Sequence, residues 1–316
     1  MEVARCGSFR SAALKLSQSI NVLRRRLDAL ERELGMPLLI RHINGVQLTP
    51  EGEKIFAAAL QMENASFDLL RARQLSSDQI AGEVAIATTE GLGSGWLMPG
   101  LVEFQTAHPN LTVNLRCGQS PPDLLRLEAD LSVQLERPKE RDLKVVKLGR
   151  LHMMMFAAKS YLAAHGVPAQ ASDLAKHRLV VMADEERRWE GHYERLLAGH
   201  SPAGLIKLRN NLGSTHFSAI VNGAGIGALP SYVPVLGADL VPLGLDINAS
   251  LDIWLTYRAD AKRVARIRKT IEWILQMYDP RRFPWFRDEF IHPDRFPEIY
   301  KGPKLRSRFL DLLASD

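Results

Sequence analysis

The chain has 316 residues, 46% of them hydrophobic, and a net charge of +5, a composition expected for a globular protein with two or three domains. No apolar run approaches the roughly 20 residues that a membrane-spanning helix needs and no signal peptide precedes Gly7, so we expect a cytoplasmic protein without a membrane partner. The two cysteines, Cys6 and Cys117, lie far apart and lack metal-ligand spacing, which argues against a disulfide framework and gives no sign of a metal or another cofactor.

The first predicted elements are two helices. A short helix contains Ala12, Ala13 and Leu16, against which the second helix can pack. Ser19 is expected to cap the second helix, because its hydroxyl accepts from the unpaired N–H groups of the first turn. Gly35 is expected to end it. Four leucines at spacings of four, three and four form one apolar stripe along this helix: Leu23, Leu27, Leu30 and Leu34.

The opposite face of the second helix is polar and basic. It carries Asn21, Arg24, Arg25 and Asp28, and residues 1–50 hold eight lysine and arginine residues against four acidic ones. Arginine side chains suit guanine edges and phosphates, and asparagine suits adenine. Taken alone, this pattern is more typical of an ordinary amphipathic helix whose charged face is exposed to solvent. The neighbouring elements therefore decide whether the helix reads DNA.

Two short strands follow the second helix. Residues 37–41 and 46–49 are predicted strands around a turn at residues 42–45. Thr49, Pro50 and Glu51 then open a long helix with a capping hydroxyl, a proline and an acid in the first turn. This order is typical of a winged helix-turn-helix, which places one helix in the DNA major groove.

Residues 7–52 resemble the LysR-type transcriptional regulators without gaps. The shared pattern is GSF with paired alanines, a serine opening the recognition helix, LE.ELG.PL, an arginine, and GV.LT..G. The resemblance implies double-stranded promoter DNA and RNA polymerase as partners. It assigns DNA contacts to eight residues: Ser19, Asn21, Val22, Arg24, Arg25, Arg41, Asn44 and Gln47.

The chain departs from the family pattern in three places. The family usually opens the recognition helix with Ser-Gln-Pro-Ala-Leu-Ser, where residues 19–24 here read SINVLR. Two wing positions that are often basic in the family are Asn44 and Gln47, which predicts a weaker minor-groove contact. Members usually carry roughly ten more residues before GSF, so we expect a shortened first helix. Either the true start of the chain lies upstream, or the chain lacks part of its DNA-binding core.

A linker helix is predicted over residues 51–80. Ile55, Met62 and Leu69 recur every seven residues, and apolar residues on more than one side of a long helix favour a partner helix. The family resemblance implies that this helix forms a homodimer, or part of a homotetramer, so that two recognition helices read two half-sites. The alternative is a helix buried within one chain.

Residues 81–278 alternate predicted strands and helices. The strands are expected at residues 83–88, 111–116 and 130–134, and the helices at residues 96–107 and 122–128. This βαβαβ order predicts an α/β fold with a parallel sheet and right-handed crossovers.

The same region resembles the family's effector-binding domain, which is of periplasmic-binding-protein type. The landmarks are LMPGLVEFQTAHPNLTV, DLSV, KSYLAAHG, VNGAGIGALPSYV and LDIWLTYR. The resemblance implies subdomain I at about residues 81–155 and 256–278, and subdomain II at about residues 156–255.

A small-molecule effector is expected in the crevice at the carboxyl ends of the strands. The glycine-rich residues 91–95 are predicted to form a turn that lines this crevice. Hydroxyls here suit a carboxylate or another polar head group, although those of Ser214 and Thr215 fit helix caps equally well. Glu90 disfavours a plain carboxylate effector unless an arginine such as Arg209 offsets it. The candidate residues are Thr88, Thr89, Glu90, Gln134, Ser214 and Thr215.

The sequence thus predicts a DNA-binding regulator modulated by an effector. The alternatives are a truncated ligand-binding module with impaired DNA binding and, more weakly, an enzyme on a binding-protein-like fold. The chain has no HExxH, GxSxG or P-loop motif, and it is the predicted winged helix that argues against an enzyme. Residues 279–316 form an extension rich in aromatic residues and proline, predicted to fold back across the effector domain or onto another subunit.

Overall fold

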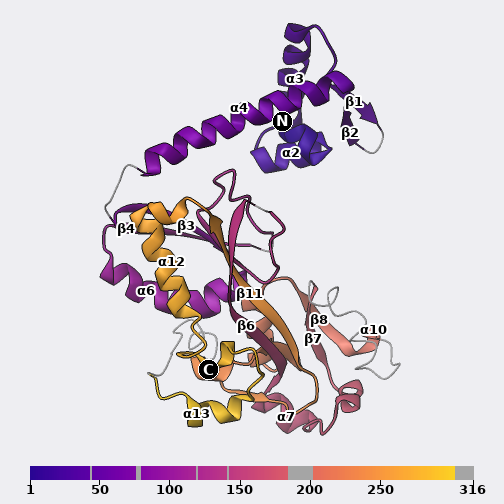
Figure 1. Ribbon diagram of the computed structural model, residues 1–316. Coiled ribbons are helices and arrows are strands. Elements are labelled where there is room, and N and C mark those ends of the chain that lie inside the picture. The colour runs from indigo at the N-terminus through magenta and orange to yellow at the C-terminus, as the bar shows by residue number, and fades with distance from the viewer. Residues whose placement is uncertain (43–44, 76–79, 119, 141, 184–201, 303–316) are drawn as a thin grey trace. The chain divides into compact units, whose positions relative to one another are not determined.

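The computed structural model describes residues 1–42, 45–75, 80–118, 120–140, 142–183 and 202–302 (Figure 1). The chain divides into two compact units, Met1–Gln74 and Leu75–Asp316. Within the described ranges, no helix has the length and apolar character needed to cross a membrane.

The first unit has the predicted winged helix-turn-helix order. A small core of Phe9, Ala12, Ala13 and Leu23 joins its second and third helices. Two predicted apolar contacts are wrong, because Leu16 and Leu30 are each 42% exposed and lie outside this core. The elements are α1 (Glu2–Cys6), α2 (Phe9–Leu16), α3 (Ile20–Leu34), the antiparallel strands β1 (Leu39–His42) and β2 (Gly45–Leu48), and α4 (Pro50–Leu75).

The short helix α1 is held by ionic contacts. Arg5 donates to Glu2 within α1 and to Glu63 of α4, where the Nη1–Oε1 distance is 3.2 Å. Lys15 of α2 lies 3.2 Å from the carboxylate of Glu2, which is buried. The hydrogen bond that Arg5 donates to Glu63 is the main reason that the pKa of Arg5 is raised. These contacts join α1 to both α2 and α4, so a five-residue helix is anchored within the unit.

The second unit is built on a mixed sheet. Strand β3 pairs in parallel with β4 and β5, as predicted for these three, but β11 pairs antiparallel with both β5 and β6. An all-parallel sheet is therefore wrong for the unit as a whole. The seven strands, in the order β10-β6-β11-β5-β3-β4 with β9 beside β6, are β3 (Gly82–Thr88), β4 (Leu111–Cys117), β5 (Leu131–Gln134), β6 (Leu143–Ala158), β9 (Gly227–Pro230), β10 (Leu240–Pro242) and β11 (Ala249–Arg258).

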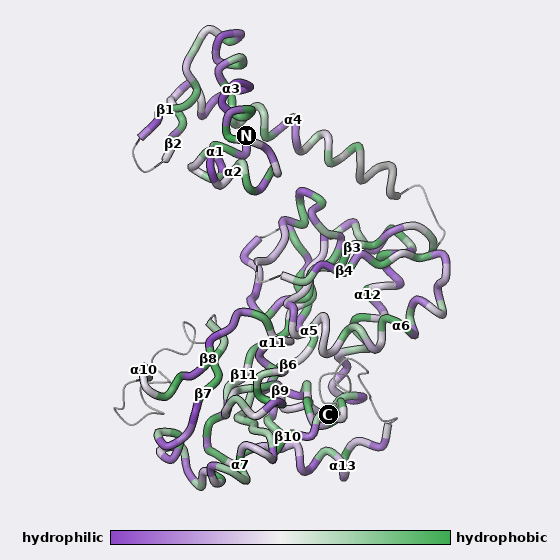
Figure 2. Tube along the Cα trace, turned by 180° about the vertical axis from the view of Figure 1, so that it is seen from behind, coloured by the Kyte–Doolittle hydropathy of each residue, from purple (hydrophilic) through white to green (hydrophobic). Residues whose placement is uncertain are grey.

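The long strands β6 and β11 connect the two parts of this sheet. They extend from the part with β3, β4 and β5 to the part with β9 and β10 (Figure 1). Much of this region is hydrophobic along the chain (Figure 2), and the last eight residues of β6 are all buried. A separate parallel pair consists of β7 (Leu179–Met182) and β8 (Ile206–Asn210). The division into subdomains at residues 155/156 and 255/256 stays a prediction.

The helices of the second unit lie between and around these strands. The glycine-rich residues 91–95 are helical rather than a turn, because α5 continues through a π-helical turn at Gly93–Leu97 into α6. The described helices are α5 (Glu90–Leu92), α6 (Met98–Ala107), α7 (Lys159–His165), α10 (Pro202–Leu205), α11 (Gly213–Val221), α12 (Ala265–Met277) and α13 (Phe296–Ile299). Short 3₁₀ turns occur at Ala171–Lys176, Val233–Leu236, Ala261–Arg263, Pro284–Phe286 and Pro293–Arg295.

The helix predicted at residues 122–128 is absent from the structure. The carboxylate of Asp123 accepts hydrogen bonds from the backbone N–H groups of Leu125 and Arg126, at 3.0 and 3.1 Å. Leu127 then has a positive φ of 58°, which ends any helical turn. The side chain of Asp123 therefore replaces the helical hydrogen bonds and gives a turn.

The C-terminal segment folds back onto the second unit, as one of the two predicted alternatives states. Phe283, Trp285 and Phe286 are at most 2% exposed, and their rings pack around Trp96 with centroids 4.9–5.7 Å away. A side chain at Gly149 of β6 would meet the carbonyl oxygen of Phe286 at 2.7 Å, so glycine permits this approach. Residues 303–316 lie outside the described part.

Polar contacts fix the same segment on strand β6. The ring Nε2 of His152 donates to the carbonyl oxygen of Arg287 at 2.8 Å. The carboxylate of Asp288 lies 2.6 Å from Lys147 and 3.7 Å from Arg150. The segment from residue 279 to 302 thus contributes to the core and the surface of the second unit.

Candidate DNA-contact surface and effector pocket

Helix α3 presents a basic face supported by the core beneath it. Ser19 caps the helix as predicted, because its Oγ accepts from the backbone N–H of Val22 at 3.2 Å. Leu23 is buried on the inner face, whereas Asn21, Arg24 and Arg25 are exposed. The helix ends at Leu34, as predicted, and Gly35 follows in a left-handed conformation.

The wing lies close to the same face. The guanidinium groups of Arg24, from α3, and Arg41, from β1, both lie 5.6 Å from the centroid of the Phe9 ring. Arg41 also forms an ion pair of 2.9 Å with Asp28. Gln47 is exposed on β2, Val22 is half-buried, and Asn44 lies outside the described residues. The structure therefore brings α3 and the base of the wing together around one aromatic ring.

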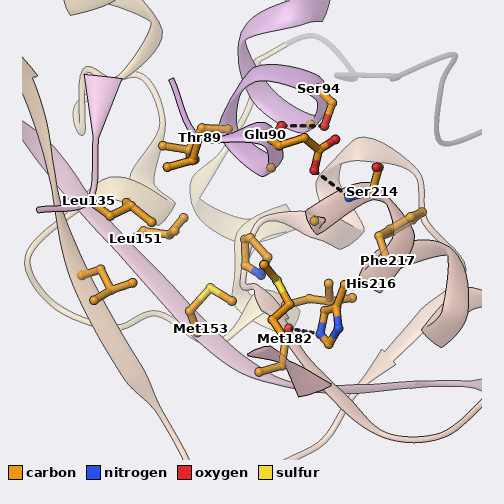
Figure 3. Close-up of a pocket in the computed structure, with 18 of the residues that line it drawn as sticks. Thr89, Glu90, Ser94, Leu135, Leu151, Met153, Met182, Ser214, His216 and Phe217 are labelled. Carbon is orange, nitrogen blue, oxygen red and sulfur yellow. Dashed lines mark hydrogen bonds between the residues drawn. The ribbon is translucent and has the colours of Figure 1, made fainter. Parts of the chain in front are cut away.

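A cavity of about 200 Å³ lies in the second unit, and Figure 3 shows many of the side chains around it. Four of the six predicted effector residues line it: Thr89, Glu90, Gln134 and Ser214. Most of the remaining lining is apolar, including Leu135, Leu151, Met153, Met182, Phe217 and Leu236. Sequence reasoning missed these apolar residues, because they come from separate elements and have no common motif.

Glu90 and Ser214 face each other across the upper part of this cavity (Figure 3). The carboxylate Oε2 of Glu90 accepts a hydrogen bond of 2.9 Å from the backbone N–H of Ser214, in the first turn of α11. A side chain at Gly213 would lie 2.9 Å from Cα of Gly91. Glycine at position 213 lets α5 and α11 approach, so the carboxylate reaches the helix N-terminus, where negative charge is stabilised.

The other expectations for this site have different outcomes. Thr88 is 1% exposed and its Oγ1 has no hydrogen-bond partner among the described residues, but it is not part of the lining. Thr215 is exposed and also lies outside the lining. Neither Ser214 nor Thr215 caps a helix, because α11 already begins at Gly213. Arg209, the arginine suggested to offset Glu90, lies on β8 and does not line the cavity.

His216 adds a buried neutral group to the wall of the cavity. Its side chain is 1% exposed, and its Nε2 donates to the carbonyl oxygen of Ala228 at 3.0 Å. Burial lowers the pKa of His216 from 6.5 to about 4, although the bond to Ala228 acts in the opposite direction. The imidazole is therefore uncharged at neutral pH.

Because His216 takes up its proton at lower pH in the folded chain than in the unfolded chain, acid favours the unfolded state. We expect the free energy of unfolding of the second unit to fall by about 3 kcal/mol from this group alone as pH decreases from 6.5 to 4. Urea titrations at pH 7 and pH 4.5 should show a smaller acid-induced loss for His216→Gln than for the wild type. His42→Gln, an exposed control, should not change the loss; equal losses in all three chains would contradict the prediction.

Comparison with known protein families shows which family the chain belongs to. Residues 1–53 match the model of the bacterial regulatory helix-turn-helix protein, lysR family, and residues 77–279 match that of the LysR substrate binding domain. The chain belongs to the LysR family of transcriptional regulators. It is thus a DNA-binding regulator with an effector-binding domain, and the part of the LysR fold that carries the cavity is the effector-binding part.

Individual LysR-type relatives agree with this assignment. The iron-regulated virulence regulatory protein IrgB of Vibrio cholerae is 30% identical over 230 residues, which are 71% of this chain and 76% of that protein. The probable HTH-type transcriptional regulator LtrA of Klebsiella pneumoniae is 25% identical over 286 residues, 85% of this chain and 89% of that one. These homologues are described as regulators, not as enzymes.

Two solved structures share the fold. The full-length Vibrio cholerae virulence activator AphB has a TM-score of 0.58 at 21% identity, covering 87% of this chain and 96% of that one. CrgA from Neisseria meningitidis has a TM-score of 0.53 at 21% identity, covering 88% of this chain and 96% of that one. At this identity the likeness concerns the fold alone, which confirms a helix-turn-helix unit joined to an α/β unit.

Proposed function

We propose that this LysR-type regulator acts in the cytoplasm and reads promoter DNA with the exposed face of α3. The observation that carries the proposal is a capped helix whose leucine side packs on its own core while Asn21, Arg24 and Arg25 remain exposed. The wing residues Arg41, Gln47 and Asn44 are proposed to contact the backbone or the adjacent groove. The contacts of α1 with α2 and α4 favour a functional DNA-binding unit over the alternative of impaired DNA binding.

We infer that α4 forms the dimer contact. Met62 and Leu69 are each 75% exposed, and Ala58 and Ala65 are exposed as well. These four residues follow one another at spacings of four, three and four, which is a heptad seam on one face of the helix. Apolar side chains this exposed favour burial against a second copy, and a dimer presents two copies of α3 to two half-sites. A tetramer would pair two such dimers.

The cavity is proposed as the effector site, with Thr89, Glu90, Gln134 and Ser214 as contacts. A ligand there alters DNA binding only if it binds one conformation of the regulator more tightly than another. The altered conformation would in turn change the contact with RNA polymerase at the promoter. This coupling gives the function as a whole: DNA occupancy set by a small molecule.

DNA binding to the region upstream of the chain's own gene tests the proposal. The full chain is titrated with that duplex and with a scrambled duplex over a salt series. We expect tighter binding to the native duplex and a steep loss of affinity as salt rises, because phosphate contacts release counterions. Equal, weak binding to both duplexes would contradict promoter reading by α3.

A further inference from the structure

The charges around the effector pocket identify the class of its ligand. Among the described residues that line it, the carboxylates are Glu90 and Glu136, and no lysine or arginine is present. Glu136 is exposed, whereas Glu90 is half-buried beside apolar walls. A second negative charge in such a site is unfavourable, since like charges repel strongly where the local dielectric constant is low.

The protein's own carboxylate occupies the position that an anionic ligand would need. The first turn of α11 is one place in the lining where a helix N-terminus directs backbone N–H groups toward a negative charge, and Glu90 itself lies at another, the start of α5. Glu90 already accepts from Ser214 there, at 2.9 Å. An anionic head group would have to displace Glu90 and remain near it. A cationic head group, in contrast, can bind the same carboxylate without breaking the bond to Ser214.

A second polar group in the wall lacks a partner. Gln134 is 6% exposed and lines the cavity, and its Nε2 has no hydrogen-bond partner within the described ranges. A buried amide donor is normally satisfied, but this nitrogen is itself inaccessible, so a ligand reaches it only if the Gln134 side chain moves. The carboxylate of Glu90, from α5, is therefore the polar group on which the ligand class depends.

The volume of the pocket and its apolar lining indicate the size and the apolar character of the ligand. An engineered apolar cavity of about 150 Å³ holds benzene, and this cavity has about 200 Å³. The space fits one aromatic ring with a short substituent. Met153 and Met182 lie on the side away from Glu90 (Figure 3), and methionine side chains adapt to aromatic rings.

We propose that the effector is a one-ring arylalkylamine, with its ammonium group on the carboxylate of Glu90 and its ring against the apolar walls. The proposal rests on the function proposed above, because it specifies the ligand of the same pocket. Glu90 is then the residue that sets the preference for positive charge.

Three matched probes test this assignment by calorimetry on the full chain. Tyramine is a cation, tyrosol is its neutral alcohol counterpart, and 4-hydroxyphenylacetate is an anion of similar size. We expect tyramine to bind about tenfold more tightly than tyrosol, since a charge-assisted bond is the stronger one, and the anion to bind most weakly. Glu90→Gln should remove the preference for tyramine over tyrosol. The control Glu103→Gln, at an exposed carboxylate of α6 that does not line the cavity, should keep the wild-type order.

Two results would overturn the proposal. Binding of 4-hydroxyphenylacetate as tight as that of tyramine would refute the charge preference, and a lack of binding by all three probes at millimolar concentration would refute a one-ring ligand. The order of the three probe affinities is measured on the wild-type chain, so the test stays valid even if Glu90→Gln misfolds. Both results leave sequence-preferring DNA binding intact, which distinguishes them from failure of the regulator function.

Discussion

Replacing Trp285 by alanine is expected to lower the free energy of unfolding of the effector unit by about 3–5 kcal/mol. The side chain is 1% exposed and contacts the rings of Trp96, Phe296 and Tyr300 with centroids 5.0–5.7 Å away. Its removal leaves a cavity where the C-terminal segment meets the π-helical turn. The melting temperature should fall by roughly 10 °C, as measured by calorimetry.

Ile299→Ala is the matched control for this variant. Ile299 belongs to the same C-terminal segment but is 37% exposed, so its truncation removes less buried surface and should lower stability by about 1–2 kcal/mol at most. A loss below 1 kcal/mol for Trp285→Ala would mean that the segment is not part of the core.

The double substitution Arg24→Ala and Arg25→Ala is expected to weaken binding to the promoter duplex by about 100-fold or more. Each arginine that contacts a base or a phosphate typically contributes about 1–3 kcal/mol. Both side chains are exposed on α3 and lie outside the Leu23 core, so folding of the unit should be preserved. Fluorescence anisotropy with native and scrambled duplexes measures the loss, and circular dichroism checks the fold.

The control for the arginine variant removes the same charge elsewhere. Arg263 and Arg268 are exposed in the second unit, and Arg263→Ala with Arg268→Ala changes the net charge equally. This control should alter promoter affinity by less than about threefold, as expected for a long-range, screened effect. Similar losses for both double variants would refute a specific role for α3.

The local elements of the first unit could be predicted because their signals lie within a few residues. Ser19, the leucine spacing and Gly35 define α3 without reference to distant parts of the chain. Leu30 shows the limit of that reasoning, since periodicity places it on the apolar stripe but it stays 42% exposed in the described part of the unit. In the second unit, residues 122–128 do not form the predicted helix, because the hydrogen bonds accepted by the Asp123 side chain compete with helical hydrogen bonds.

The cavity proposed as the effector site could be predicted only in part. Strand ends placed Thr89, Glu90 and Gln134 correctly in the lining, because topology brings the carboxyl ends of neighbouring strands together. Met153 and Phe217 could not be found this way, since they approach the pocket from β6 and α11 and depend on tertiary packing. The bond from Glu90 to Ser214 joins residues 124 positions apart, a distance over which sequence patterns carry no signal.

The place of the C-terminal segment in the core also has a consequence for synthesis. Trp96 emerges from the ribosome well before Phe283, Trp285 and Phe286, the rings that enclose it. Domains fold as they are made, from the N-terminal end, so the DNA-binding unit can form while the effector unit still lacks these rings. A product that ends before residue 283 would carry a DNA-binding unit attached to an incomplete, exposed core, which proteases and chaperones recognise. The C-terminal segment must therefore be translated before the regulator is stable.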